Sequence, residues 1–272
     1  MHVAAFSADA PAEDILVYLT PIADSVLSPS GTTGLLPSRK MDIVGLYAGA
    51  NLTATPTTPT LVRAQPSAPT FIQVITPAIQ PLSPTAAPDS DPPLQLLTDH
   101  PLPLPAGEAL TVQVEVSALL STVAAVVFLR EKFEPLPPGP MYTLRGVASA
   151  TTPTSRSWTQ IAITWAQQLP AGRCAIAWIQ YIAPTGTAAP IAARLVLPDQ
   201  VLRPGALAQP LVSSLPNRQM QDGVFGLLGT FESFAMPTVE VLQIGAAPTA
   251  TGEIHLGLIR LTDAAGRPCR CS

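Results

Sequence analysis

Three observations predict an all-β fold, an antiparallel two-sheet sandwich or barrel. Hydrophobic residues make up 47% of the chain, but aromatic residues make up only 5%. The 32 prolines and 17 glycines divide the chain into many short segments, which is unlike a helical bundle. From Gly107 onward apolar and polar residues alternate with a period of two, as in strands with one buried face.

The alternation is clearest from Thr111 to Val116, where the three valines share one face and the polar residues share the other. Arg173 to Ile182 is instead apolar on both faces, which predicts a central strand or one whose outer face meets another subunit. About nine strands over about 165 residues fit one antiparallel sandwich or barrel. The strands that we expect in this part are Thr111–Val116, Val123–Arg130, Tyr142–Ser149, Trp158–Trp165, Arg173–Ile182, Ile191–Leu197, Gly223–Phe231, Thr238–Ile244 and Gly252–Leu261.

Two features between these strands concern turns. The four residues Leu104–Gly107 recur as Leu169–Gly172, and we interpret the repeat as local turn chemistry, with proline fixing φ and glycine taking a positive φ, rather than as a duplicated domain. Val201 to Gly223 contains no convincing strand, so we expect a long connection there, and connections of that length usually carry contacts or function.

The first 106 residues have a different composition, dense in proline, threonine and alanine. Frequent proline excludes regular helices and central strands, so we expect an extended amino-terminal arm with short strands and loops over residues 1–106, followed by a jelly-roll sandwich over residues 107–272. The short elements expected in the arm are strands at Asp42–Ala48, Thr60–Arg63 and Thr70–Thr76, short helices at Ala12–Leu19 and Ile22–Leu27, and a loop or polyproline segment at Pro81–Pro105.

Charge is unusually scarce. Only 12% of the residues are charged, against about 25% in an ordinary globular protein, so we expect copies of the chain or other partners to cover its surface. The net charge is -4, and the only lysines are Lys40 and Lys132, so we expect no direct nucleic-acid binding. We expect no secretion signal, because acidic residues interrupt the start, and no membrane span, because the longest apolar run, Val116 to Leu129, is too short.

No motif predicts catalysis. The sequence contains no nucleophile elbow, no phosphate-binding loop and no dinucleotide-binding glycine pattern. His2 is terminal, His100 lies in the proline-rich loop and His255 lies on the polar face of a strand, so we interpret all three as surface histidines without a role. They have no zinc-ligand spacing. We therefore predict no catalytic, cofactor-binding or metal-binding residue.

Three weaker signals have simpler interpretations. Asp89, Asp91 and Asp99 form an acidic stretch with oxygen ligands suited to calcium, but we favour solubilising charges. The odd number of cysteines argues against a disulfide framework, and we favour reduced thiols over a soft-metal site at the C-terminus. The cysteines are Cys174, Cys269 and Cys271. Asn51 begins a glycosylation acceptor pattern, which means little without a secretion signal.

The three tryptophans, Trp158, Trp165 and Trp178, allow two interpretations. Aromatic faces bind carbohydrate in lectin-like sandwiches, but the positions of these residues in predicted strands favour packing in the core or at an interface. The glycines at intervals of three in Gly223–Phe231 indicate an edge packed against another chain.

Residues 107–262 resemble jelly-roll capsid proteins, in particular the vertical single jelly-roll lineage of tailless icosahedral viruses of bacteria and archaea. The segments that carry this resemblance are Gln168–Ile176, Ala193–Pro198 and Arg203–Gly205, together with strand order, turn punctuation and length. The resemblance implies an eight-stranded sandwich that forms capsomers, with arms and loops joining neighbours, and it implies no active site. The chain is short for a double jelly roll, so one jelly roll with a long arm is the better match.

We therefore expect a non-catalytic, self-assembling structural subunit of a viral capsid, major or minor, located in the virion after assembly in the host cytoplasm. The expected partners are further copies and other capsid proteins. Because the chain has no basic arm to bind the genome, an internal membrane or another protein would lie between this subunit and the genome. The alternative is a β-sandwich binding module, such as an adhesin or a receptor-binding or glycan-binding protein. A hydrolase with scattered carboxylates also stays open, because glycosidase acids have no local sequence signature.

Overall fold

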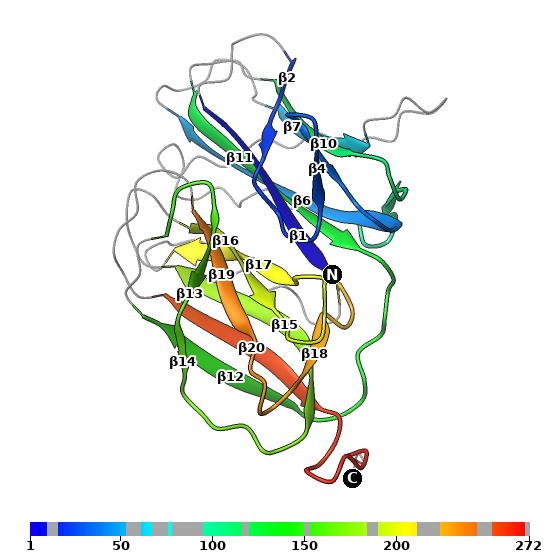
Figure 1. Ribbon diagram of the computed structural model, residues 1–272, viewed down its shortest axis with the longest axis vertical. Coiled ribbons are helices and arrows are strands. Elements are labelled where there is room, and N and C mark those ends of the chain that lie inside the picture. Colours follow the sequence, from blue (N-terminus) through cyan, green and yellow to red (C-terminus); the bar gives the residue numbers. More distant parts are fainter. Residues whose placement is uncertain are drawn as a thin grey trace. The chain divides into compact units, whose positions relative to one another are not determined.

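The computed structural model describes residues 1–9, 16–52, 61–66, 76–77, 95–115, 120–149, 153–183, 190–210, 224–243 and 252–269. Over these residues the chain is all-β and forms no helix, and its strands are almost all antiparallel (Figure 1). The all-β prediction is therefore confirmed. No helix of the described part is long and apolar enough to span a membrane.

Contacts divide the chain into two compact units. We call them the N-terminal unit, chiefly Val3–Lys132, and the C-terminal unit, chiefly Phe133–Val212 and Asn217–Ser272 with Met1–His2. Each unit has its own sheets and its own buried core.

Two sheets form the N-terminal unit. The first has the order β3-β1-β11-β6-β8, with β9 also paired to β6, and the second has the order β2-β10-β5-β4, with β7 also paired to β10. The strands of the first sheet are β1 (His2–Asp9), β3 (Thr20–Pro21), β6 (Met41–Leu52), β8 (Gln95–Leu96), β9 (Leu102–Leu104) and β11 (Leu120–Arg130). Those of the second are β2 (Leu16–Tyr18), β4 (Ser28–Ser30), β5 (Gly34–Leu36), β7 (Leu61–Pro66) and β10 (Leu110–Glu115).

The core of the N-terminal unit depends on the three central strands β1, β11 and β6. β11 runs between the other two, and its described side chains from Val123 to Arg130 are all buried. Val3 to Phe6 of β1 are likewise buried on both faces. Burial on both faces explains why these strands read as continuous apolar runs rather than as alternating ones.

One curled sheet of nine strands forms the C-terminal unit. Its order is β13-β19-β16-β17-β15-β20-β12-β14, with β18 paired to β15. The strands are β12 (Met141–Ala148), β13 (Trp158–Ile161), β14 (Ile163–Trp165), β15 (Arg173–Ala183), β16 (Pro190–Val196), β17 (Gly205–Pro210), β18 (Gly229–Glu232), β19 (Thr238–Gln243) and β20 (Glu253–Arg260).

The two ends of this sheet meet, so it forms a near-closed barrel. β13 and β14 stand at opposite ends of the strand order, yet only Ala162 separates them in the chain. Leu144, Leu256 and Ile179 point inward from one side, and Leu195 and Val241 belong to the strands of the other side; all five are buried. Closing a sheet on itself leaves few unpaired strand edges.

Most predicted strands are confirmed within four residues at each end in the described part, namely those at Asp42, Thr60, Thr111, Val123, Tyr142, Arg173, Ile191, Thr238 and Gly252. Trp158–Trp165 is divided into β13 and β14. In Gly223–Phe231 only the last three residues form a strand, and Val224–Leu228 do not.

Two predicted segments of the proline-rich stretch lie largely outside the described residues, namely Thr70–Ile75 and most of Pro81–Pro105. The described part of Pro81–Pro105 contains the short strands β8 and β9, both paired with β6, so the prediction of a loop or polyproline segment is wrong there. Thr76 is described and pairs with Ala64 of β7. The backbone N–H of Thr76 donates to the carbonyl of Ala64 at 2.9 Å, and the backbone N–H of Ala64 donates to the hydroxyl of Thr76 at 2.9 Å.

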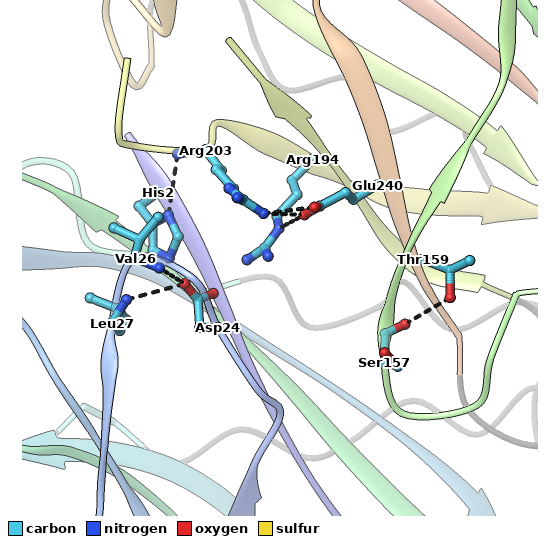
Figure 2. Close-up of polar contacts among 9 residues, drawn as sticks. All are labelled: His2, Asp24, Val26, Leu27, Ser157, Thr159, Arg194, Arg203 and Glu240. Carbon is cyan, nitrogen blue, oxygen red and sulfur yellow. Dashed lines mark hydrogen bonds and ion pairs between the residues drawn. The ribbon is translucent and has the colours of Figure 1, made fainter. Parts of the chain in front are cut away.

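Three further predictions of local structure are wrong. The prediction of no strand in Val201–Gly223 fails because Gly205–Pro210 forms β17, whose hydrogen bonds with both β15 and β16 compensate for its weak alternation. Ile22–Leu27 does not form the expected helix, because the carboxylate of Asp24 accepts hydrogen bonds from the backbone N–H groups of Val26 and Leu27, at 2.7 and 3.2 Å (Figure 2). The helix expected at Ala12–Leu19 is replaced by β2 in its described part.

The turn interpretation of the repeated tetrapeptide is confirmed. Gly107 and Gly172 have φ values of 76° and 137°, in the region that favours glycine. The two copies precede β10 and β15, which hold different places in their sheets.

The proline-rich arm expected over residues 1–106 is not confirmed. The described strands of this stretch pair with β10 and β11 and contribute buried side chains to the N-terminal unit. The compact units divide between Lys132 and Phe133.

A chain lacking residues 1–80 tests this arrangement. The deletion removes β1 and β6, the two neighbours of β11, so we expect β10 and β11 to lose their amide protection while β15 and β20 retain theirs. Hydrogen exchange read by mass spectrometry measures both regions in one sample. Native protection of β11 in the truncated chain would show that residues 1–80 are a dispensable arm.

Candidate functional site

The structure places the three histidines in three different settings. His2 is fully buried, and its Nδ1 accepts the backbone N–H of Arg203 at 3.2 Å, so the surface assignment is wrong for His2. His100 is exposed, as expected. His255 is half-buried and contacts a carboxylate, so it is not an isolated surface histidine.

The other candidate residues come together at no metal site. Asp99 is exposed, and Asp89, Asp91 and Cys271 lie outside the described residues. Cys174 is a buried free thiol whose pKa is raised, chiefly by burial, and Cys269 is a half-buried free thiol. Within the described ranges no group of three or more His, Cys, Asp or Glu side chains could hold a metal ion.

The most distinctive polar feature lies on the outer face of the C-terminal unit, the face opposite its core, over β12, β20 and β15. These three strands run side by side in Figure 1. Register places Arg145, His255 and Gln180 in one row across the strands, and Thr143, Gly257 and Trp178 in the next row. We call Arg145, Gln180, Glu253, His255 and Trp178 the outer-face cluster.

Glu253 is the hub of the polar half of this cluster. Arg145 donates from Nε to its Oε2 at 2.9 Å and from Nη2 to its Oε1, and Nε2 of His255 lies 3.1 Å from Oε2. These hydrogen bonds, the one from Arg145 first, lower the pKa of Glu253 to about 2. The same pairing raises the pKa of Arg145. Glu253 is therefore a charged acceptor held in place by two neighbours on a solvent-facing surface.

Trp178 supplies the aromatic half of the cluster. Gly257 stands opposite it on β20, and a Cβ added there would overlap Nε1, Cε2 and Cδ1 of the indole at nearly equal distances. The indole therefore lies across the strand over the glycine. Its Nε1 donates to Sδ of Met141 at 2.9 Å, which fixes the ring edge. Trp165 is placed differently, because a Cβ added at Gly146 would meet Cγ2 of Ile163 first and the six-membered ring of Trp165 second.

A second polar network lies on β16 and β19 (Figure 2). The carboxylate of Glu240 accepts Arg194 Nε at 2.7 Å and Arg203 Nη1 at 2.6 and 2.7 Å. Arg194 is only 1% exposed, and its guanidinium carbon lies 4.1 Å from the ring centroid of Trp158. A buried arginine that is bonded and stacked in this way holds strands together and offers little surface to a ligand.

Sequence reasoning missed both networks because their members are distant in the chain. Arg145 and Glu253 are 108 residues apart, and only the pairing of β12 with β20 brings them together. The available signal was the alternation of Glu253, His255 and Gly257 along one strand, which gives a shared face but not the partner strand.

The buried network predicts an unequal effect of two similar substitutions. Glu240→Gln leaves two arginines without their counter-charge, so we expect it to lower the free energy of unfolding of the C-terminal unit by about 3 kcal/mol. Glu253→Gln removes a solvent-facing pair and should cost about 0.2–1 kcal/mol. Because Trp158, Trp165 and Trp178 all lie in this unit, tryptophan fluorescence during denaturant titration measures its unfolding. Equal losses for the two variants would contradict the structural role of Glu240.

The lowered pKa of Glu253 predicts an acid effect. The folded-state pKa of about 2 lies below the ordinary value of 4.5, so the stabilisation from Arg145 and His255 is fully present above pH 4.5 and is lost as pH falls toward 2. Solvent screening limits this stabilisation to about 0.2–1 kcal/mol. Denaturant titrations between pH 5 and pH 2 should show a smaller loss of stability in Glu253→Gln than in the unchanged chain. Parallel curves would mean that the pair is not formed in solution.

No protein-family model, no curated protein and no solved structure matches this chain.

Proposed function

We propose that the chain is a non-catalytic, self-assembling structural subunit of a viral capsid, built from jelly rolls. The observation that carries this proposal is the strand order. When an eight-stranded antiparallel ribbon folds into a jelly roll, strand 1 pairs with 8, 2 with 7, 3 with 6 and 4 with 5, and then 8 packs beside 3 and 7 beside 4. Capsid proteins and lectins are among the proteins that use this arrangement.

The C-terminal unit has all six of these pairings if β12, β13, β15, β16, β17, β18, β19 and β20 are numbered 1 to 8. The ribbon pairs are β12 with β20, β13 with β19, β15 with β18 and β16 with β17. The lateral pairs are β20 with β15 and β19 with β16. β14 follows β13 in the chain, as a continuation of strand 2, and it pairs with β12. One parallel contact joins β15 to β17.

The described part of the N-terminal unit follows the same plan. β1 pairs with β11, β2 with β10 and β6 with β9, which correspond to the pairs 1–8, 2–7 and 3–6. β11 pairs laterally with β6, and β10 with β7. This order favours a second jelly roll over the extended arm that we expected from the sequence.

The surface also favours assembly. Charged residues make up 12% of the chain, and several large apolar side chains of the C-terminal unit are exposed. They include Phe234, which is 86% exposed on the turn between β18 and β19, and Val201, which is 61% exposed between β16 and β17. Large apolar side chains exposed on turns are available for contacts between subunits. The net charge of -4 favours other capsid proteins or an internal membrane, rather than the genome, as the neighbours inside a virion.

The second candidate is a β-sandwich binding module. The outer-face cluster favours it, because a flat indole beside a fixed carboxylate and guanidinium is a surface suited to a ligand.

The mass of the native protein tests the capsid proposal. Light scattering of the purified chain over a range of concentrations, with electron microscopy of the same fractions, should give uniform capsomer-sized rings, sheets or shells. Phe234→Asp introduces a charge at the most exposed apolar position and should reduce the assembled fraction without unfolding the chain. A monomer at every concentration would overturn the capsid proposal and leave the binding module.

A further inference from the structure

We propose that the outer-face cluster is a saccharide-binding site in which Trp178 stacks on one neutral pyranose ring while Glu253 and Arg145 bind hydroxyl groups of a neighbouring sugar unit of the same oligosaccharide. This site goes beyond assembly and does not depend on it. It rests on the position of the indole, the spacing of the two register rows and the charge balance of the face.

The indole is held flat before any ligand arrives. Gly257 has no side chain, so the five-membered ring of Trp178 occupies the space where a Cβ would stand. Met141 accepts its N–H at the ring edge. The ring is half-buried, because it lies over the strand and packs against the buried cluster of Ala175, Ala177 and Ile259, and only its remaining exposed part is available for stacking. A pyranose presents a flat patch of C–H groups that packs on such a face, and a ring already fixed loses little entropy on binding.

The polar groups stand at a suitable distance from this ring. Arg145 and His255 lie in the register row next to that of Trp178, two residues along each strand, which is about 7 Å. Glu253 lies one row further, four residues from Gly257, which is about 13 Å. These spacings correspond to about one and two hexose units. A hydroxyl group both donates and accepts, so it needs an acceptor and a donor side by side. The carboxylate of Glu253 and the half-exposed guanidinium of Arg145 supply these two.

The charge of the face favours a neutral ligand. Arg145 and Glu253 neutralise each other, so a phosphate or sulfate would meet a carboxylate as well as an arginine. A protein partner would need more apolar area than Trp178 and Met141 offer. Toward the beginning of β15 the same face is covered, because Leu136, Leu227 and Leu261 pack with Trp178 on Ala175, Ala177 and Ile259. The polar part of the face, from Trp178 to Glu253, is therefore the part left for a ligand.

Titration calorimetry of the full-length chain with cellohexaose, maltohexaose, chitohexaose and mannohexaose tests the site. We expect binding of at least one of these probes, weakened about 10-fold or more by Trp178→Ala. Glu253→Gln and Arg145→Gln should each weaken the same binding about 5-fold or more, since each leaves a hydroxyl partner unpaired. Tyr142→Ala is the matched control, because Tyr142 is an exposed aromatic residue of β12 on the alternate face, and it should change the affinity less than about 2-fold.

Three results would overturn the site. The first is no heat of binding with any of the four probes at millimolar concentration, and the second is binding that survives both Trp178→Ala and Glu253→Gln. The third is a change of native mass in these variants without any effect on saccharide binding, which would assign the face to contacts between subunits. Glu253→Gln lies at the solvent-facing surface and keeps the test valid if Trp178→Ala fails to fold. Light scattering of the same samples distinguishes failure of the site from failure of the capsid proposal.

Discussion

The pairing of the first strand of each unit with its last strand is the constraint on which the rest of the structure depends. β1 pairs with β11, and β12 pairs with β20, so each unit is closed by hydrogen bonds between residues about a hundred positions apart. Pairing at such separations is entropically costly to form, and it becomes stable only when side chains between the sheets are buried together. The inward-facing leucine, isoleucine and valine residues of the C-terminal unit supply that burial.

This constraint also separates what the sequence predicts from what it does not. Alternation fixes which residues share a face, so β10, β12, β19 and β20 are predictable from their own residues. Alternation does not determine which strand pairs with a given strand. The meeting of Arg145 with Glu253, and of Arg194 with Glu240, follows from strand order, and no local pattern encodes it.

The errors in local prediction have the same physical origin. β17 has prolines at its borders and small apolar residues within, and its own propensity is weak, but neighbours on both sides hydrogen-bond to it. The apolar stretch around Asp24 satisfies a helical pattern, yet a side-chain carboxylate offers the backbone a closer partner than a helical turn would. Proline-rich composition predicted an arm for residues 1–106, whereas prolines at strand borders are compatible with the short strands observed there.

Closure of the barrel determines where interactions with other molecules can occur. A strand whose two edges are paired cannot add another strand, so in the described part of the C-terminal unit every strand except β13, β14 and β18 is limited to recognition through its faces and adjoining turns. The turns carry exposed apolar side chains such as Phe234, and the free part of the outer face carries paired charges around Trp178. Apolar turns suit association with other subunits, whereas a flat, charge-balanced face with one aromatic ring suits a small polar ligand. One chain can therefore assemble through its turns and still leave the outer-face cluster open to a saccharide.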